Sequence, residues 1–361
     1  MNEQIKSLML RAVEDGIFPS AQLLVAKAGH IIIDEPFGNA TGETIFDVAS
    51  LTKPISTTTL LMQLVAEDKI RLDDTLQQLI PQCQCEAKTN ITVRHLLSHS
   101  SGLPAWQPFY QTIPTDDIGE PSGKMQIIDA CCREPLIYTH GQQSIYSDLG
   151  FILLGEIIES VTKMSISKVF NEKVATPLSL NNTFFVPLTP SLSPQGRGLG
   201  EGASFAPTED CPWRNKVMRG EVHDQNCYAM GGVAGHAGLF STTADIHKFL
   251  KVFVESFKTS GSFLHHDTVQ RFLPFHYKLT DCNSTWLLGW DTPAHGNSQA
   301  GEYFSHKSIG HLGYTGCSMW IDLEKEIWII LLTNRIHPTS TNEKIKSFRP
   351  MIYNEIFEEV L

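Results

Sequence analysis

Residues 44–66 read TIFDVASLTKPISTTTLLMQLVA, a short strand-like run followed by a long helical one. Apolar residues at 55, 60, 61, 64 and 65 have the spacing of a helix that begins near Ser50, with Pro54 in its first turn. Ser50 and Lys53 then lie on one face. A serine at the positive end of the helix dipole, near backbone N–H groups that can hold an oxyanion, is a candidate nucleophile. A lysine one turn later is a candidate base if burial lowers its pKa.

Ser-x-x-Lys is a weak signal by itself, because the chain contains two more copies, Ser160–Lys163 and Ser165–Lys168. Both copies fall at the end of a helical pattern or in the turn after it, where the helix dipole has the wrong sign. Ser50, in contrast, follows a strand-like run and opens a long helix. The chemistry of Ser50 therefore has to be judged together with other motifs.

Outward from this stretch, strand patterns lie near both ends of the chain and helical patterns lie between them. Residues 21–38 carry two apolar runs around Gly29-His30, and residues 317–334 carry two more, so each stretch predicts a β-hairpin. Residues 70–180 are mostly helical in pattern. We expect an α+β fold, in which helices flank one antiparallel sheet built from both ends of the chain and a mostly helical region is inserted.

This order of elements predicts two structural units. The first is an α/β sheet domain of residues 1–70 and 242–361, and the second is a mostly helical domain of residues 71–241. Residues 187–215 are rich in Pro, Gly and Ser and are expected to form a long surface loop or lid. Their GRGLGEG run follows no strand and precedes no Gly-Lys-Ser/Thr, so it is not expected to bind phosphate.

Composition excludes several classes of partner. The 361 residues include 28 Lys and Arg against 39 Asp and Glu, a net charge of −11, with no dense basic run. We therefore expect no nucleic-acid partner. No apolar run reaches the roughly 18 residues of a membrane span, and the first helix lacks the features of a secretion signal. We expect a cytoplasmic location, or a periplasmic one if a leader precedes the printed sequence, while the oligomeric state is not indicated.

Neither the cysteines nor the histidines form a metal-binding pattern. The eight cysteines include a Cys-x-Cys at 83 and 85 and an adjacent pair at 131 and 132, which match no zinc or redox spacing. We expect reduced thiols. His95 and His99 lie four residues apart, but no Glu-x-x-His motif supports a metal site, so core or capping roles are expected. We expect no metal and no cofactor.

Two further motifs complete an ordered set. Tyr146-Ser147-Asp148 precedes a helical pattern, and His311-Leu312-Gly313 precedes a strand pattern. Taken singly, the first would be a helix cap with a packing tyrosine, and the second a turn with an exposed histidine. With Ser50-x-x-Lys53 before them, they follow the order of the motifs of serine β-lactamases and penicillin-binding proteins. The chain resembles that superfamily, in particular its class C-like branch of esterases, D-aminopeptidases and D-Ala-D-Ala carboxypeptidases.

The resemblance extends over residues 17–340. It is carried by LLSHSSGL, GGVAGHAGLFSTTADIHKF, GHLGYTGCSMWIDLEKEIWIILLTNRIHP, and APTEDCPW followed by EVHDQN. It implies a β-lactamase/transpeptidase-like fold and a serine hydrolase that acts on a small-molecule or peptide substrate: an ester, an amide or a D-amino-acid-containing peptide. The alternatives are a β-lactamase, a D-Ala-D-Ala carboxypeptidase, or a non-catalytic sensor or assembly module that kept the pocket.

The resemblance also implies a role for individual residues. Ser50 would be the acylated nucleophile, Lys53 would help to deprotonate it, and Tyr146 would shuttle protons and activate the deacylating water. The backbone N–H groups of Ser50 and Tyr314 would form the oxyanion hole.

The strand that carries His311 and Gly313 would line the acyl pocket, and two residues depart from the usual motifs. Asp148 stands where asparagine is usual, and its carboxylate would raise the pKa of Lys53 and repel an acidic substrate. His311 replaces the usual lysine and removes a fixed positive charge that would hold a substrate carboxylate. If His311 binds substrate as a cation, activity should fall as the pH rises through its pKa. Both departures favour the ester, amide or peptide substrate over a penicillin.

Three more residues have two interpretations each. His236 lies in a glycine-rich stretch and is either structural or at the edge of the pocket. Trp106 and Tyr110 follow a Ser-Gly break and either line the pocket or pack in the core.

Overall fold

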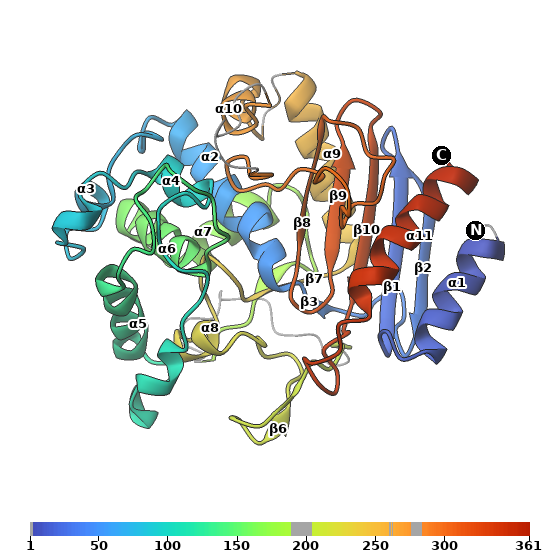
Figure 1. Cartoon of the computed structure of the whole chain (residues 1–361), viewed down its shortest axis with the longest axis horizontal. Helices are drawn as coiled ribbons and strands as arrows, with labels where there is room; N and C mark the ends of the chain where they lie inside the picture. Colours follow the sequence, from blue (N-terminus) through green and yellow to red (C-terminus); the bar gives the residue numbers. More distant parts are fainter. Residues whose placement is uncertain (1–2, 189–203, 260, 262, 276–283) are drawn as a thin grey trace.

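The computed structural model describes residues 3–188, 204–259, 261, 263–275 and 284–361. Its largest sheet is antiparallel, with the strand order β2-β1-β10-β9-β8. The strands are β1 (Ser20–Lys27), β2 (His30–Gly38), β8 (Ser308–Leu312), β9 (Ser318–Asp322) and β10 (Ile327–Thr333). Because β1 pairs with β10, both ends of the chain build one sheet, as the sequence predicts (Figure 1). Both predicted hairpins, β1–β2 and β9–β10, are confirmed.

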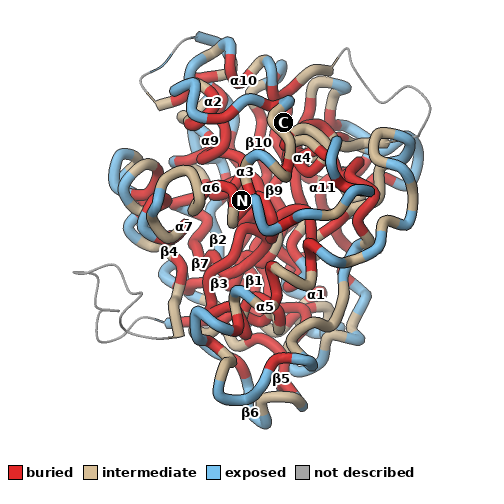
Figure 2. The backbone as a smooth tube through the Cα atoms, turned by 90° about the vertical axis from the view of Figure 1, so that its left-hand side faces the viewer, coloured by how far each residue is buried: buried red, intermediate tan, exposed pale blue. Residues whose placement is uncertain are grey.

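Helices cover both faces of this sheet. α1 (Glu3–Glu14) and α11 (Ile345–Glu359) lie against one face, and α9 (Thr243–Lys258) lies against the other (Figure 1). Alternate residues of a strand point to opposite faces, so β10 contributes Ile329 to the cluster with α1 and Ile330 to the cluster with α9. Figure 2 shows the buried residues concentrated along the central strands, with exposed residues on the outer helices.

The middle of the chain is mainly helical among the residues described. Its α-helices are α2 (Thr59–Ala66), α3 (Leu76–Leu79), α4 (Val93–Leu97), α5 (Pro121–Arg133), α6 (Asp148–Thr162), α7 (Ile166–Phe170), α8 (Gln225–Ala229) and α10 (His266–Phe272). Shorter turns are η3 (Glu86–Lys88), η4 (Phe109–Thr112), η5 (Thr115–Asp117) and η6 (Asn171–Ala175). Two small sheets are formed by β3 (Phe46–Asp47), β7 (Leu239–Ser241) and β4 (Phe184–Phe185), and by β5 (Asp210–Cys211) with β6 (Lys216–Val217). The division into two units remains a prediction.

Two local expectations need correction or limits. The helix expected from Ser50 starts as a 3-10 turn, η1 (Ala49–Leu51), and continues as a π-helix, η2 (Lys53–Thr58), before α2. Pro54 lies in this irregular part and has no N–H to donate. Residues 187–215 were expected to form a loop. Residues 189–203 of this stretch lie outside the described residues, and its later part contains the short strand β5.

The expectation of eight reduced thiols is wrong for two of them. Cys83 and Cys132 form a disulfide, with their Cα atoms 4.9 Å apart. The pair joins the segment after α3 to α5, which the sequence separation of 49 residues does not reveal. Among the described residues, no helix has both the length and the apolar character needed to cross a membrane.

Candidate active site

The candidate nucleophile, Ser50, lies in a strained turn that a buried carboxylate holds. Ala49, directly before Ser50, has φ of 48°, which is rare for a residue with a side chain. Asp47 accepts hydrogen bonds from the backbone N–H groups of Ala49 (2.9 Å) and His223 (2.7 Å). Burial raises the pKa of Asp47, and these N–H donors act against that rise. Asp47 is therefore a positioning residue that sequence reasoning missed, although it stands three residues before Ser50.

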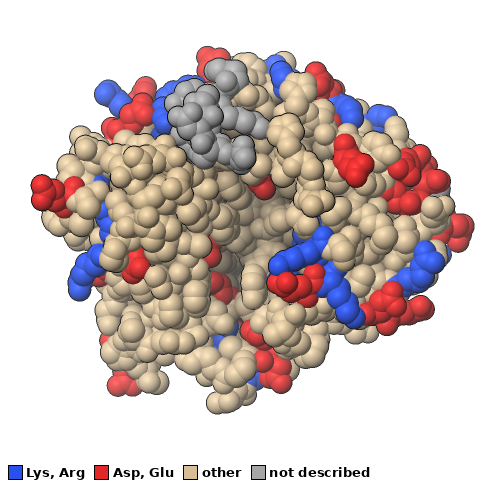
Figure 3. Space-filling model, in the orientation of Figure 1, with Lys and Arg blue, Asp and Glu red and all other residues tan. Residues whose placement is uncertain are grey.

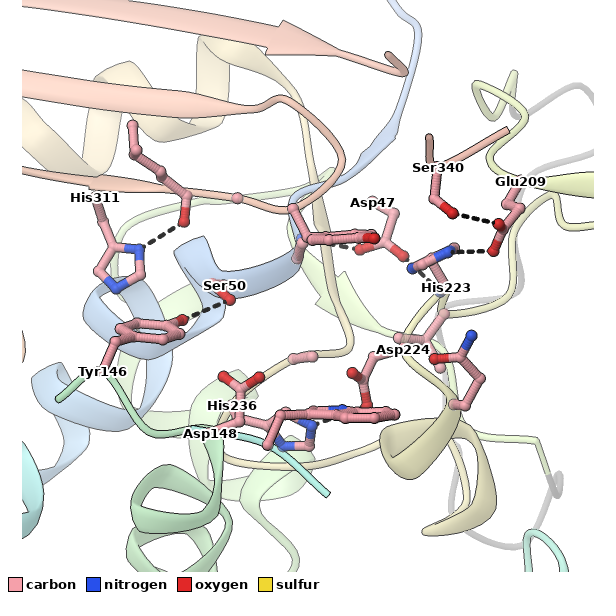
Figure 4. A pocket seen from close by; sticks show the side chains of 18 of the residues that line it. Asp47, Ser50, Tyr146, Asp148, Glu209, His223, Asp224, His236, His311 and Ser340 are labelled. Atoms are coloured by element: carbon pink, nitrogen blue, oxygen red, sulfur yellow. Dashed lines mark hydrogen bonds and ion pairs between the residues drawn. The ribbon is translucent and has the colours of Figure 1, made fainter. Parts of the chain in front are cut away.

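Two predicted partners meet the Ser50 hydroxyl. Lys53 Nζ donates to Ser50 Oγ at 2.9 Å, and Tyr146 OH donates to the same oxygen at 2.8 Å (Figure 4). Lys53 and Ser50 are neighbours in the chain, whereas Tyr146 arrives from the segment before α6. Two donors aimed at one oxygen stabilise negative charge on it, as a nucleophile in acyl transfer requires.

Lys53 is fully buried and has three polar neighbours. Besides Ser50 Oγ, its Nζ contacts Asp148 Oδ1 at 2.6 Å and the backbone oxygen of His236 at 3.1 Å. Burial lowers the pKa of Lys53, while the charge and hydrogen bond of Asp148 act in the opposite direction. The expected contact with Asp148 is present, but burial outweighs it and the net shift favours the neutral amine.

Tyr146 and Asp148 are positioned by the start of α6. Ser147 is the N-cap of this helix and accepts the N–H of Gly150, so its neighbours on either side face the pocket. The ring of Tyr146 packs 4.6 Å from that of His99. Burial, followed by the charge of Asp148, raises the pKa of Tyr146 well above its ordinary value. Tyr146 is therefore a neutral phenol that donates to Ser50.

His95 lies in α4 and His99 lies two residues after the end of this helix, and both hold backbone groups in place. His99 Nδ1 accepts the backbone N–H of Ser147 at 3.0 Å, and His95 completes a capping box with Thr92. The structure therefore assigns His95 and His99 to capping and core positions, as expected.

His311 lies on the edge strand β8 and is almost completely buried. The alternative of a turn with an exposed histidine is wrong. Its Nδ1 donates to the backbone oxygen of Leu312 at 2.8 Å (Figure 4). Burial, with the nearby charge of Lys53, lowers the pKa of His311 to about 3. His311 is therefore a neutral imidazole near pH 7, and it does not offer the positive charge considered for this position.

Neutral His311 leads to a pH prediction. We expect His311 to contribute no titration step to the pH profile of kcat/KM between pH 5 and pH 8. The profile of His311→Gln should therefore have the same shape as that of the wild type. The free energy of unfolding should fall as the pH decreases from 6.5, because the unfolded chain then binds a proton that folded His311 does not bind until about pH 3. The contribution reaches about 1.4 kcal/mol per pH unit in that window.

Rate measurements and urea unfolding of both proteins at several pH values check this prediction. The variant should lose stability less steeply on acidification. A wild-type activity that declines between pH 6 and pH 7, and no longer declines in the variant, would contradict a neutral His311.

Gly313 permits the end of β8 to approach the turn that carries Ser50. A Cβ added at Gly313 would lie 2.6 Å from the backbone oxygen of Val48 and 3.5 Å from Ala49 Cβ. Tyr314, the next residue, lines the pocket and stacks on His223 with ring centroids 5.5 Å apart. The Tyr314 amide as an oxyanion donor remains a prediction.

Gly313→Ala is expected to lower kcat by about 10- to 100-fold, because strand β8 would have to move away from the Ser50 turn. Overpacking of this kind also costs about 1–3 kcal/mol of stability. Steady-state kinetics with urea unfolding checks both effects. Gly42→Ala is the matched control, because nothing lies within 4 Å of a Cβ added there. Equal activity of the two variants would remove the spacing role of Gly313.

These side chains surround a cavity of about 680 Å³, within the size range of small-molecule sites. All the predicted site residues except buried Lys53 line it. Trp106 and His236 also line the cavity, whereas Tyr110 packs against Trp213 with ring centroids 4.6 Å apart. Figure 3 shows a hollow near the centre of this face of the molecule.

A second part of the cavity wall carries residues to which no role was assigned from the sequence. Glu209 and His223 pair at 2.8 Å, and Asp224 pairs with His236 at 2.9 Å (Figure 4). Glu209 lies in the APTEDCPW stretch, and His223 and Asp224 lie in EVHDQN. The resemblance of these stretches was the available signal, although it assigned no function to them.

Comparison with known proteins extends this picture. A relative from Escherichia coli (strain K12), named "Putative D-alanyl-D-alanine carboxypeptidase", is 31% identical over 357 residues, which cover 89% of this chain and 79% of the relative. A relative of the same name from Salmonella agona (strain SL483) is also 31% identical, over 92% of this chain and 82% of its own.

Solved structures show the same fold at lower identity. EstCE1, described as a hydrolase with promiscuous acyltransferase activity, superposes with a TM-score of 0.72 at 21% identity, covering 97% of this chain and 98% of its own. The octameric penicillin-binding protein homologue from Pyrococcus abyssi superposes with a TM-score of 0.73 at 19% identity, covering 99% of this chain and 77% of its own.

The profile of the Beta-lactamase family matches residues 5–348, nearly the whole chain. The β-lactamase/transpeptidase-like fold expected from the motifs is confirmed, and so is the expected class, a serine hydrolase. With the three predicted motifs at one pocket and a family match over almost its full length, this chain belongs to the beta-lactamase family.

Proposed function

We propose that this protein hydrolyses an ester, an amide or a peptide through an acyl group carried covalently by Ser50. The observation that carries the proposal is the pair of hydrogen-bonding groups beside Ser50 Oγ, Lys53 Nζ at 2.9 Å and Tyr146 OH at 2.8 Å, at the wall of a small-molecule cavity. No metal or cofactor takes part in the proposed steps.

In the acylation step, Lys53 accepts the hydroxyl proton of Ser50 while Ser50 Oγ attacks the substrate carbonyl carbon. Burial favours the neutral amine that this step needs, and the carboxylate of Asp148, 2.6 Å away, stabilises the ammonium that forms. Tyr146, a neutral phenol, relays a proton from this ammonium to the leaving group as the carbon–leaving-group bond breaks.

In the deacylation step, a water molecule attacks the acyl carbon. Tyr146 lies next to Ser50 Oγ and is the group that would orient this water and return a proton to the serine. The backbone N–H groups of Ser50 and Tyr314 would stabilise the oxyanion in both steps.

A D-alanyl-D-alanine peptide is the second candidate substrate, because of the names of the relatives from Escherichia coli and Salmonella agona. Hydrolysis of p-nitrophenyl butyrate and release of D-alanine from such a peptide, measured side by side, test the proposal. Turnover of either substrate supports a hydrolase. A stable acyl adduct without turnover of either would favour the sensor or assembly module.

Of the two locations expected from the sequence, we propose the periplasmic one. The Cys83–Cys132 disulfide supports it, because such bonds persist in oxidising compartments.

A further inference from the structure

The cavity around Ser50 is lined by acidic side chains. In the described part of the chain, no lysine or arginine lines it, and the adjacent Lys53 is paired with Asp148. The carboxylates that line the cavity are Asp47, Asp148, Glu209, Asp224 and Asp291. A substrate carboxylate held beside these groups would therefore meet repulsion and would find no lysine or arginine to pair with among these residues.

Two of these carboxylates point into the cavity beside the nucleophile, as Figure 4 shows for Asp148 and Asp224. Asp148 contacts Lys53 through Oδ1, and Asp224 accepts His236 Nε2 and the Cys227 N–H through Oδ1. Their side chains are 18% and 21% exposed, so each still presents surface to a ligand. Burial opposes the ionisation of Asp224, but the charge and hydrogen bond of His236 outweigh it and lower its pKa.

The His311 side chain, which also lines the cavity, has a ring nitrogen without a hydrogen-bond partner among the residues described. His311 is 1% exposed, and its Nε2 has no partner among the residues described. Because Nδ1 carries the proton given to Leu312, Nε2 is an acceptor, and His311 lines the cavity beside Tyr146 (Figure 4). A buried acceptor without a partner is costly, so a ligand with an N–H or O–H group fits here and a carboxylate does not.

We propose that this cavity selects substrates that carry a protonated amino group next to the scissile carbonyl, and that it rejects substrates with a carboxylate there. The inference rests on the proposed function, because it takes Ser50 as the attacking atom. Lys53 Nζ contacts both Ser50 Oγ, at 2.9 Å, and Asp148 Oδ1, at 2.6 Å, so the Asp148 carboxylate lies within two hydrogen bonds of the attacking oxygen. An amine on the carbon beside the scissile carbonyl can therefore reach it. His311 Nε2 then accepts from a donor elsewhere on the substrate.

The test is a binding measurement that does not depend on catalysis. Isothermal titration calorimetry of the Ser50→Ala protein at pH 7 compares alaninamide, N-acetylalaninamide and N-succinylalaninamide, each in the D and L forms. At this pH most α-amino groups are protonated. We expect the better alaninamide to bind with a Kd on the order of tenfold lower than its acetylated form, with the succinylated form weakest.

Two isosteric substitutions in the same background separate a local contact from the general charge of the cavity. Asp224→Asn keeps the oxygen that accepts from Cys227 and His236, so it preserves the cap of α8, but it removes the charge. We expect it to abolish most of the preference for the amine. The matched control is Glu209→Gln, since both Glu209 oxygens are held, by His223 and by Ser340, and the preference should remain.

Equal or tighter binding of the acetylated or succinylated form would overturn the inference, and so would an equal loss of preference in both variants. Absence of hydrolysis by the wild-type protein would contradict the proposed function while leaving this binding result standing, so the two failures are distinguishable.

Discussion

Ser50→Ala is expected to lower the hydrolysis of p-nitrophenyl butyrate by about 10⁴-fold or more, because it removes the only atom that forms the acyl bond in the proposed mechanism. The fold should persist. Lys53 keeps Asp148 and the backbone oxygen of His236 as partners, so the free energy of unfolding should change by only about 1 kcal/mol. Initial rates, with circular dichroism and urea unfolding of both proteins, make the comparison.

Ser56→Ala is the matched control for this experiment, since Ser56 is buried in the same segment and does not line the cavity. It should retain most of the activity. A folded Ser50→Ala protein with more than a few per cent of the wild-type rate would rule out Ser50 as the nucleophile.

Lys53→Met is expected to destabilise the protein by about 3–5 kcal/mol, because it leaves the Asp148 carboxylate without its hydrogen-bond donor in a largely buried site. The double variant Lys53→Met with Asp148→Asn also removes the carboxylate that had lost its partner, and should recover most of that stability. Neither variant should recover activity, because neither has a base for Ser50. Urea unfolding and steady-state rates of the single and double variants test both statements.

The double variant separates a structural lysine from a catalytic one. Recovery of stability without activity supports the assignment of Lys53 as the base. A double variant that hydrolyses the ester at a rate close to wild type would show that Lys53 only neutralises Asp148.

The sheet was predictable from local patterns, and the meeting of the three motifs was predictable from the resemblance. Alternating and apolar runs near both termini predicted the strands, and the resemblance predicted that Tyr146 and His311 approach Ser50, although both lie far from it in the chain. In the structure, Tyr146 OH is 2.8 Å from Ser50 Oγ, and the Tyr146 and His311 ring centroids are 6.0 Å apart.

Properties that depend on burial were less accessible. The resemblance implies that Asp148 would raise the pKa of Lys53, but the larger effect of desolvation follows from packing that no local pattern reveals. The same holds for His311, whose ordinary pKa near 6.5 made a cationic role reasonable. Burial of the ring and the nearby Lys53 charge remove that role.

Contacts through the backbone and between distant cysteines were also beyond local patterns. Asp47 acts through the N–H groups of Ala49 and His223, and a carboxylate three residues before a serine has no distinctive spacing. Disulfide connectivity cannot be deduced from cysteine spacing, so the Cys83–Cys132 pair required the structure.

The central claim, a covalent acyl group on Ser50, is tested most directly by labelling with a fluorophosphonate probe, followed by intact-mass measurement and peptide mapping. The account predicts that one probe molecule adds to the wild-type protein, that it maps to Ser50, and that the Ser50→Ala protein remains unlabelled. Labelling at a different residue, or equal labelling of the two proteins, would contradict it.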